Sequence, residues 1–363
     1  MNGRERMQTI LRKETPDRMG LFEHFWGETL PEWVKQGYPT DEAGNPRPPH
    51  EVFAYDLLGC GPGVDTAPRR GFREVVEESE DWELVRTGTG ALLRLWKHKS
   101  GTPEHVGFEL TTRERWDQVK KPLLEFDAER ISNLEEYRNG REKTRADGRF
   151  ATTHLLFVFE FLRGSLGDVC MLESMLCDPE WIHDVCRVVS DCMIRHLRYA
   201  FEQAGAPDGA FVYEDLGYTN GLWASPKIMS ELVMPYHKEL VDFFHSQGLP
   251  AILHTCGDVR DAVDLIVDCG WDCLQPMEAK AGNDVVAFAE QCDGRMAFMG
   301  NINVMVLETG DRGAIRREIE SKLIPLRERG VPYVFHSDHS IPPTIRYDSY
   351  RYALDVFREL ADY

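Results

Sequence analysis

The second half of the chain alternates between short apolar runs and amphipathic stretches. The apolar runs, rich in Val, Phe, Leu and Met, are typical of buried strands, and the stretches between them have helical spacing and often end in Gly. The predicted strands are residues 209–216, 249–256, 272–277, 295–301 and 331–337, and the predicted helices are 225–247, 259–270, 283–294 and 311–330. This succession predicts parallel strands joined by crossover helices.

Polar residues follow the carboxyl ends of these strands, which favours a closed barrel over an open three-layer sheet. In a barrel the carboxyl ends converge on one mouth, whereas in an open sheet they spread along an edge. The polar residues at these ends are Glu214, Asp215, His254, Cys256, Gln275, Glu278, Asn301, Asn303, His336 and His339. We therefore expect an α/β protein with a (β/α)8 TIM-barrel fold.

The first half of the chain is less regular. Residues 18–26 are expected to form the first barrel strand, and residues 152–161 a later one. Between them, residues 71–112 alternate in polarity around Gly-rich turns, which predicts a β-hairpin excursion over the barrel. Because no linker or repeat marks a boundary, residues 1–363 are expected to form one barrel domain with an N-terminal extension and this insertion.

Composition limits the classes of partner and the location. The 61 acidic and 42 basic residues give a net charge of −19, which disfavours nucleic acid and strongly anionic substrates. No apolar run approaches the roughly 18 residues that span a bilayer, so we expect no membrane partner. The N-terminal segment has no apolar signal core, and the nine cysteines are scattered, so we expect free thiols and a cytoplasmic location.

His254 and Cys256 form the most specific candidate site. Two residues apart on an extended segment, their side chains point to the same side, and imidazole with thiolate suits Zn²⁺. A catalytic zinc needs a third protein ligand, which His336, Asp338 or His339 can supply after the last strand. The alternative is a core histidine beside a buried free cysteine.

Four acidic residues are candidates for roles at the site, including proton transfer. Glu214 and Asp215 are adjacent on a strand, so only one can face the site, and either can instead cap the next helix. Glu278 can bind metal, act as an acid or base, or orient a histidine. Asp56 is a candidate for handling protons if the site holds no metal.

Four further residues are predicted to contact substrate. His24 and Trp26 lie where a loop would follow the first strand, and Tyr218 and Asn301 lie near later strand ends. Aromatic walls with few charges suit a small or flat substrate. The alternative for Trp26 is plain core packing.

Several motifs in order resemble the uroporphyrinogen decarboxylase superfamily. They are "SPKIMSELVMPYHKELV" (225–241), "HTCGD" (254–258), "FMGNINV" (298–304) and "HSIPP" (339–343), and the resemblance covers about residues 150–360. It implies a (β/α)8 barrel with its site at the carboxyl end of the strands.

The resemblance is closer to one branch of that superfamily than to the decarboxylases themselves. Those enzymes carry an arginine-rich segment that holds substrate carboxylates, but here the corresponding stretch is "EHFWGETLPEW". Zinc-dependent corrinoid methyltransferases, such as methylcobamide:coenzyme M methyltransferases, share the His-x-Cys-Gly motif. Their third ligand is a cysteine before a Gly-Ile-Pro turn, and this chain has "HSIP" there. The resemblance therefore implies His254, Cys256 and His339 as zinc ligands.

The activity implied is methyl transfer between a small substrate and a corrinoid. No Asp-x-His-x-x-Gly corrinoid motif is present, so the corrinoid is expected on a separate protein, and the family suggests a homodimer. One alternative is a metal-free decarboxylase or lyase acting on a less anionic substrate, in which Asp56 or His339 handles protons. Another is a non-catalytic ligand-binding barrel.

Overall fold

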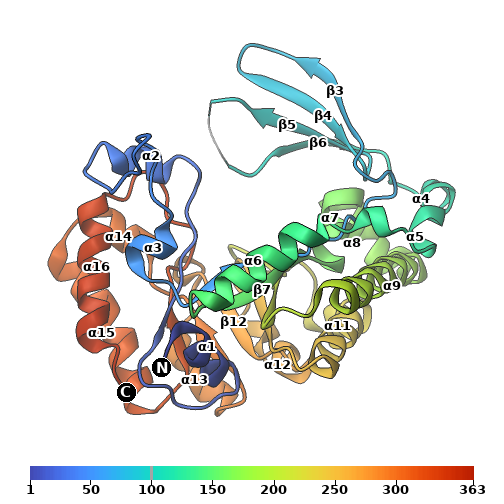
Figure 1. The fold of residues 1–363 in the computed structure, drawn as a ribbon. Coiled ribbons are helices and arrows are strands. Elements are labelled where there is room, and N and C mark those ends of the chain that lie inside the picture. The colour runs from blue at the N-terminus through green and yellow to red at the C-terminus, as the bar shows by residue number, and fades with distance from the viewer. Residues whose placement is uncertain (99–100) are drawn as a thin grey trace.

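The computed structural model describes residues 1–98 and 101–363, and its central feature is an eight-stranded sheet (Figure 1). All neighbouring strands in this sheet are parallel. In spatial order the strands are β1 (Gly20–Leu21), β14 (Tyr333–Phe335), β13 (Ala297–Met299), β12 (Cys273–Pro276), β11 (Ala251–Thr255), β8 (Gly209–Tyr213), β7 (Phe150–Leu156) and β2 (Leu57–Gly59). The five strands predicted in the second half are confirmed, and the fold is the expected (β/α)8 barrel.

The first and last strands of this order meet at Asp56. The Asp56 backbone N–H donates to the Leu21 carbonyl at 2.9 Å, and the Asp56 carboxylate accepts from the Leu21 N–H at 2.8 Å. These two hydrogen bonds join the segment before β2 to β1 and close the sheet into a barrel.

Helices surround the barrel and supply the crossovers. They are α1 (Gly3–Leu11), α2 (Thr29–Val34), α3 (Pro49–Phe53), α4 (Arg113–Val119), α5 (Lys121–Leu124), α6 (Leu134–Ala146), α7 (Val158–Leu166), α8 (Asp168–Cys177), α9 (Pro179–Ala204), α10 (Pro226–Leu232), α11 (Met234–Ser246), α12 (Val263–Asp268), α13 (Val285–Cys292), α14 (Val304–Glu308), α15 (Arg312–Glu328) and α16 (Tyr347–Leu360). Short 3₁₀ turns occur at Ala128–Arg130, Arg260–Ala262 and Ala279–Ala281. Among the residues described, no helix is both long and apolar enough to cross a membrane.

The predicted hairpin insertion is a separate four-stranded antiparallel sheet. Its strands are β3 (Arg73–Glu78), β4 (Trp82–Thr87), β5 (Ala91–Trp96) and β6 (Glu104–Phe108), paired in chain order. Figure 1 shows this sheet standing away from the barrel above α7 and α8. Every residue of β3 is exposed, so the sheet is anchored mainly through its inner strands.

The strand expected over 18–26 is only Gly20–Leu21, and the helix expected over 259–270 is a 3₁₀ turn at Arg260–Ala262 followed by α12. Two further predicted elements also differ from those observed. The helix expected over 225–247 is divided at Val233 into α10 and α11, because Pro235 has no backbone N–H to continue the first helix. The strand expected over 152–161 ends at Leu156, and α7 begins at Val158. The apolar run there is continuous, so periodicity alone does not mark this boundary.

A small hairpin of β9 (Gly217–Tyr218) and β10 (Gly221–Leu222) follows β8.

Candidate functional site

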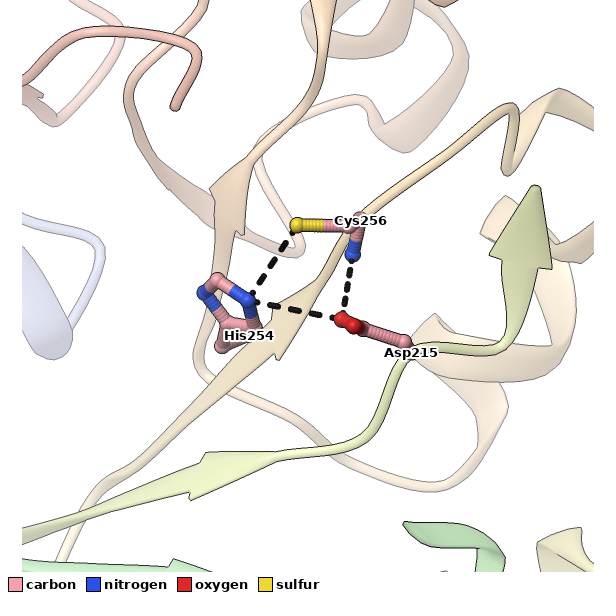
Figure 2. Close-up of side chains that lie close together, drawn as sticks. All are labelled: Asp215, His254 and Cys256. Carbon is pink, nitrogen blue, oxygen red and sulfur yellow. Dashed lines mark hydrogen bonds and ion pairs between the residues drawn. The ribbon is translucent and has the colours of Figure 1, made fainter. Parts of the chain in front are cut away.

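Asp215, His254 and Cys256 converge at the mouth of the barrel (Figure 2). Asp215 follows β8, His254 lies in β11, and Cys256 is the first residue after β11. His254 Nε2 lies 3.4 Å from Cys256 Sγ and 3.4 Å from Asp215 Oδ1. The Asp215 Oδ1 also accepts the Cys256 backbone N–H at 2.9 Å, which holds the carboxylate against the strand end.

A second group of donors shares the same thiol. Ligand atoms of Cys256, Glu278 and His339 lie within 4.8 Å of one another, as do those of Asp215, His254 and Cys256. Cys256 thus connects two sets of three donors drawn from the carboxyl ends of four strands and the loops that follow them.

The backbone at Gly257 makes this convergence possible. Gly257 has a φ of +80°, and a Cβ placed there would lie 2.3 Å from the Gly217 backbone. Only glycine therefore allows the chain to turn so closely against the segment after β8. The Gly257 N–H donates to Glu278 Oε1 at 3.2 Å, so the same turn positions the Glu278 carboxylate.

Hydrogen bonds inside the barrel set the orientation of the His254 ring. His336 Nδ1 lies 2.5 Å from the Ser337 carbonyl oxygen and must donate, because a carbonyl only accepts. His336 Nε2 is then the acceptor for the Gln275 amide nitrogen at 3.3 Å, and Gln275 Oε1 accepts from His254 Nδ1 at 2.5 Å. The remaining nitrogen of His254, Nε2, faces Cys256.

The Cys256 thiol is buried beside two carboxylates. Burial, followed by the charges of Asp215 and Glu278, raises the pKa of Cys256 well above its usual range. Burial also acts to raise the pKa of Asp215, but its hydrogen bond and charge interaction with His254 prevail and lower that pKa to about 2. Asp215 is therefore ionised, and its carboxylate faces Nε2 of His254.

The donor set fits a zinc ion. A bound divalent cation would separate the facing donors and lower the pKa of the thiol. Imidazole nitrogen, thiolate sulfur and carboxylate oxygen are the ligand types that Zn²⁺ takes in proteins. The five available residues exceed the three ligands of a catalytic site, so some of them are left for substrate or proton handling.

The structure brings together five of the residues named from the sequence, namely Asp215, His254, Cys256, Glu278 and His339. The two other candidates for a third ligand lie elsewhere. His336 is buried inside the barrel, and the Asp338 carboxylate accepts the backbone N–H groups of Ala279 and Val304 at 2.9 and 2.8 Å.

Of the two adjacent acids, Asp215 enters the site and Glu214 does not. Glu214 is fully buried, and its carboxylate accepts the backbone N–H groups of Phe157, Phe159 and Glu160 at the start of α7. It also contacts His237 Nε2 at 2.9 Å. The expectation of a catalytic Glu214 is therefore replaced by a capping role, because three unpaired N–H groups at this helix end require an acceptor.

Asp56 lies at the opposite end of the barrel from the site. It precedes β2, and its buried carboxylate pairs with Arg6 at 2.6 Å and with Arg18 at 3.2 Å. The same carboxylate caps the Leu21 N–H in the barrel closure. Since the amino ends of barrel strands face away from the mouth, Asp56 cannot act on a substrate held there.

The four predicted substrate contacts have different surroundings. Trp26 stacks on His339 with ring centroids 5.8 Å apart, and Tyr218 is 43% exposed at the mouth. Both ring nitrogens of His24 are engaged inside the barrel, with His336 at 3.0 Å and Tyr213 at 3.2 Å.

Asn301 does not face the mouth. It is fully buried, and its side chain bonds to backbone groups of Met277, Asn283 and Val285. The prediction that it binds substrate is therefore wrong, and its role is to hold the loops after β12 and β13 together.

Two residues of this region were not singled out from the sequence. Tyr213 Oη lies 3.0 Å from His154 Nδ1, and the Tyr213 ring lies 4.9 Å from that of His254. Both residues occupy inward positions near the ends of β7 and β8. Their period-two spacing from Thr152 and Phe211 is a signal that could have identified them.

A parallel (β/α)8 barrel with thiol, imidazole and carboxylate donors at its mouth defines the class of protein. A sequence model of the uroporphyrinogen decarboxylase (URO-D) family matches residues 163–360, which is more than half of the chain. The chain therefore belongs to this family.

Solved structures agree with the fold. A methyltransferase from Methanosarcina mazei superposes with a TM-score of 0.66 at 15% identity, covering 99% of both chains. A 3-keto-D-glucoside 4-epimerase from E. coli gives a TM-score of 0.35 at 10% identity, covering 71% of this chain and 96% of its own. A class V chitinase from Pseudomonas fluorescens gives a TM-score of 0.42 at 8% identity, covering 93% of this chain and 99% of the chitinase chain. The last two are too distant to carry an argument. No curated protein matches the sequence.

Proposed function

We propose that this protein is a zinc-dependent methyltransferase that exchanges a methyl group between a small substrate and a corrinoid carried on a separate protein. The observation that carries the proposal is that two donor sets share Cys256, one with Asp215 and His254 and the other with Glu278 and His339. The similarity to a structure named as a methyltransferase is in keeping with it.

The protein's own residues have distinct roles in this proposal. His254 Nε2 and Cys256 Sγ would hold the ion. The third ligand would be His339, which shares a donor set with Cys256 and whose ring stacks on Trp26. A zinc ion bound there supplies the positive charge that lowers the pKa of a substrate thiol or other heteroatom group. Asp215 balances the charge of the ion and fixes the end of β11 through the Cys256 N–H.

Glu278 is the residue that we assign to proton transfer. Its Oε1 is held by the Gly257 N–H at 3.2 Å, and its Oε2 lies 3.2 Å from Lys280 Nζ. The carboxylate is buried and close to Cys256, so it can accept the proton that a substrate group loses on binding. Before this proton transfer, Lys280 stabilises the charged Glu278 carboxylate.

The first test is the metal content of the purified protein, prepared without a histidine tag and measured by inductively coupled plasma mass spectrometry. We expect about one zinc per chain in the wild type and little in Cys256→Ala, because Cys256 belongs to both donor sets. Cys177→Ala is the matched control, since Cys177 is an exposed free thiol outside the site.

The second test is the consumption of methylcobalamin, followed by absorbance, with a series of thiols as acceptors. Consumption that depends on zinc and is lost in Cys256→Ala supports the proposal. A wild-type protein that binds no zinc after reconstitution contradicts it, and favours a metal-free lyase or a ligand-binding barrel.

A further inference from the structure

A cavity of about 450 Å³ lies at the mouth beside the candidate metal centre. It is enclosed by the end of β7, by α7, by the loop after β2 and by the turn between β4 and β5 of the inserted sheet. Among its lining residues are Thr66, Thr89, His154, Phe157, Glu160 and Ser165. Its size lies in the range of small-molecule sites, so it is large enough to hold a substrate.

The inserted sheet completes this cavity. Thr89, in the turn between β4 and β5, lines it and contacts the Gly164 carbonyl of α7 at 3.4 Å. The hydroxyls of Thr87 and Thr89 lie 2.8 Å apart, which fixes the turn at this contact. The insertion thus supplies a wall that the barrel alone lacks.

One polar group in the cavity wall has no partner within the protein. Ser165 is fully buried, and its Oγ makes no hydrogen bond with any described residue. A buried hydroxyl without a partner is unfavourable, and a ligand in the cavity would relieve that cost by bonding to it. The remaining walls are largely apolar, with Phe157, Phe161 and Met193 among them.

The charges around the cavity argue against an anionic ligand. None of its lining residues is Lys or Arg, and two of them, Asp65 and Glu160, are acidic. The Asp65 carboxylate is taken up by backbone N–H groups of the next turn, and Glu160 Oε1 accepts from Arg163 at 2.7 Å. A carboxylate or phosphate in the cavity would find no free cation to pair with.

The inner wall of the cavity contacts the candidate metal centre. His154 Nδ1 bonds to Tyr213 Oη at 3.0 Å, and the Tyr213 ring packs 4.9 Å from His254. Glu160 Oε1 accepts the Asp215 N–H at 3.3 Å. A ligand in the cavity therefore lies within one layer of side chains of the ligands proposed for zinc.

We propose that this cavity binds the uncharged, largely apolar body of the substrate, with the Ser165 hydroxyl bonded to one of its polar atoms. The role as substrate site rests on the proposed methyl transfer, whereas the class of ligand rests only on the walls of the cavity. The inserted sheet then takes part in substrate selection, because Thr89 lines one side of the cavity.

Three variants test the assignment. At Gly164, which lines the cavity, an added Cβ would meet no atom within 4 Å, so Gly164→Leu fills the space without strain in the helix. Ser165→Ala removes the unpartnered hydroxyl. Ser190→Ala is the matched control, because Ser190 is equally buried with an unpartnered Oγ but does not line the cavity.

The probes are 2-naphthalenemethanol and its anionic counterpart 2-naphthoate, titrated into the full-length protein and followed by calorimetry. We expect the alcohol to bind at least tenfold more tightly than the acid. Gly164→Leu should abolish binding of the alcohol, Ser165→Ala should weaken it about three- to tenfold, and Ser190→Ala should leave it unchanged. Equal binding of the acid, no saturable binding of the alcohol, or binding that survives Gly164→Leu overturns the proposal.

The same titrations separate this proposal from the proposed function. Binding of the alcohol by protein that holds no zinc would leave the cavity assignment standing and remove its link to methyl transfer. Zinc-bound protein that does not bind the alcohol would overturn the cavity assignment and leave the proposed methyl transfer standing. Thermal melting of Gly164→Leu serves as the folding control, and Tm should not fall, since leucine favours a helix more than glycine does.

Discussion

His254 and Gln275 face each other as register partners on the neighbouring parallel strands β11 and β12, with His254 Nδ1 2.5 Å from Gln275 Oε1. This contact is set by the pairing of two barrel strands. The orientation of the His254 ring, and with it the direction of Nε2, is therefore part of the barrel framework.

Replacement of Gln275 should weaken metal binding, although Gln275 is not itself one of the proposed metal ligands. Gln275→Leu removes the acceptor that holds Nδ1, so we expect the affinity for zinc to fall about 10- to 100-fold. Gln275→Glu keeps an acceptor oxygen for Nδ1 but loses the donor to His336 Nε2, so it should retain more zinc affinity than Gln275→Leu. Competition with a chromophoric chelator measures the affinity, and equal affinities for the leucine variant and the wild type would contradict the proposed orientation.

The two adjacent acids should give opposite phenotypes. Glu214→Gln puts an amide NH₂ group among three backbone donors, so we expect a loss of about 2–3 kcal/mol in the free energy of unfolding and normal zinc content. Asp215→Asn should lower the affinity for zinc with little change in stability. Urea denaturation together with metal analysis compares the two variants, and loss of zinc in Glu214→Gln alone would reverse our assignment.

Asp56 is expected to matter for stability only. Asp56→Asn removes one of the two carboxylates that pair with the buried Arg6, and Asp17 remains as the other. A buried charge left wholly unpaired costs about 3–5 kcal/mol, and the cost here should be smaller because Arg6 keeps its pair with Asp17. We expect a correspondingly lower free energy of unfolding and unchanged zinc content per folded chain. A variant with wild-type stability and lost zinc would place Asp56 in the site after all.

Glu23 should make stability fall as pH rises. Burial outweighs its hydrogen bonds to Ser337 and raises the pKa of Glu23 to about 8, so the folded protein holds a proton that the unfolded chain releases near pH 4.5. Its contribution to stability is therefore full below pH 4.5 and is lost as pH rises to about 8. Glu23→Gln keeps a neutral side chain throughout.

The measurement is the free energy of unfolding at pH 5 and pH 8. We expect the wild type to lose more stability over this interval than Glu23→Gln, by an amount of the order of a few kcal/mol. The same pH dependence in both proteins would show that Glu23 is ionised in the fold.

Much of the barrel could be predicted because its signals are local. Strands β8, β11, β12, β13 and β14 are short apolar runs separated by helical spacing, and each was found at its predicted place. Strand β2 has only three residues and β7 continues into the apolar start of α7, so neither a boundary nor a period was visible there. The inserted sheet was detected as alternation, but its four strands were not resolved.

The sequence by itself determined which residue types meet at the mouth. His254 and Cys256 share one side of an extended segment, and parallel strands bring Glu278 and the loop with His339 to the same end of the barrel. These conclusions need only the two-residue period of a strand and the common direction of parallel strands.

Only the tertiary structure decided what each polar residue does there. Glu214 and Asp215 are neighbours in the chain, and their roles differ because the start of α7 lies on one side of β8 and the end of β11 on the other. Asn301 likewise holds two loops together, because its side chain is surrounded by buried backbone groups. A carboxylate or an amide bonds to whatever donors packing places beside it, and those donors come from segments that are distant in the sequence.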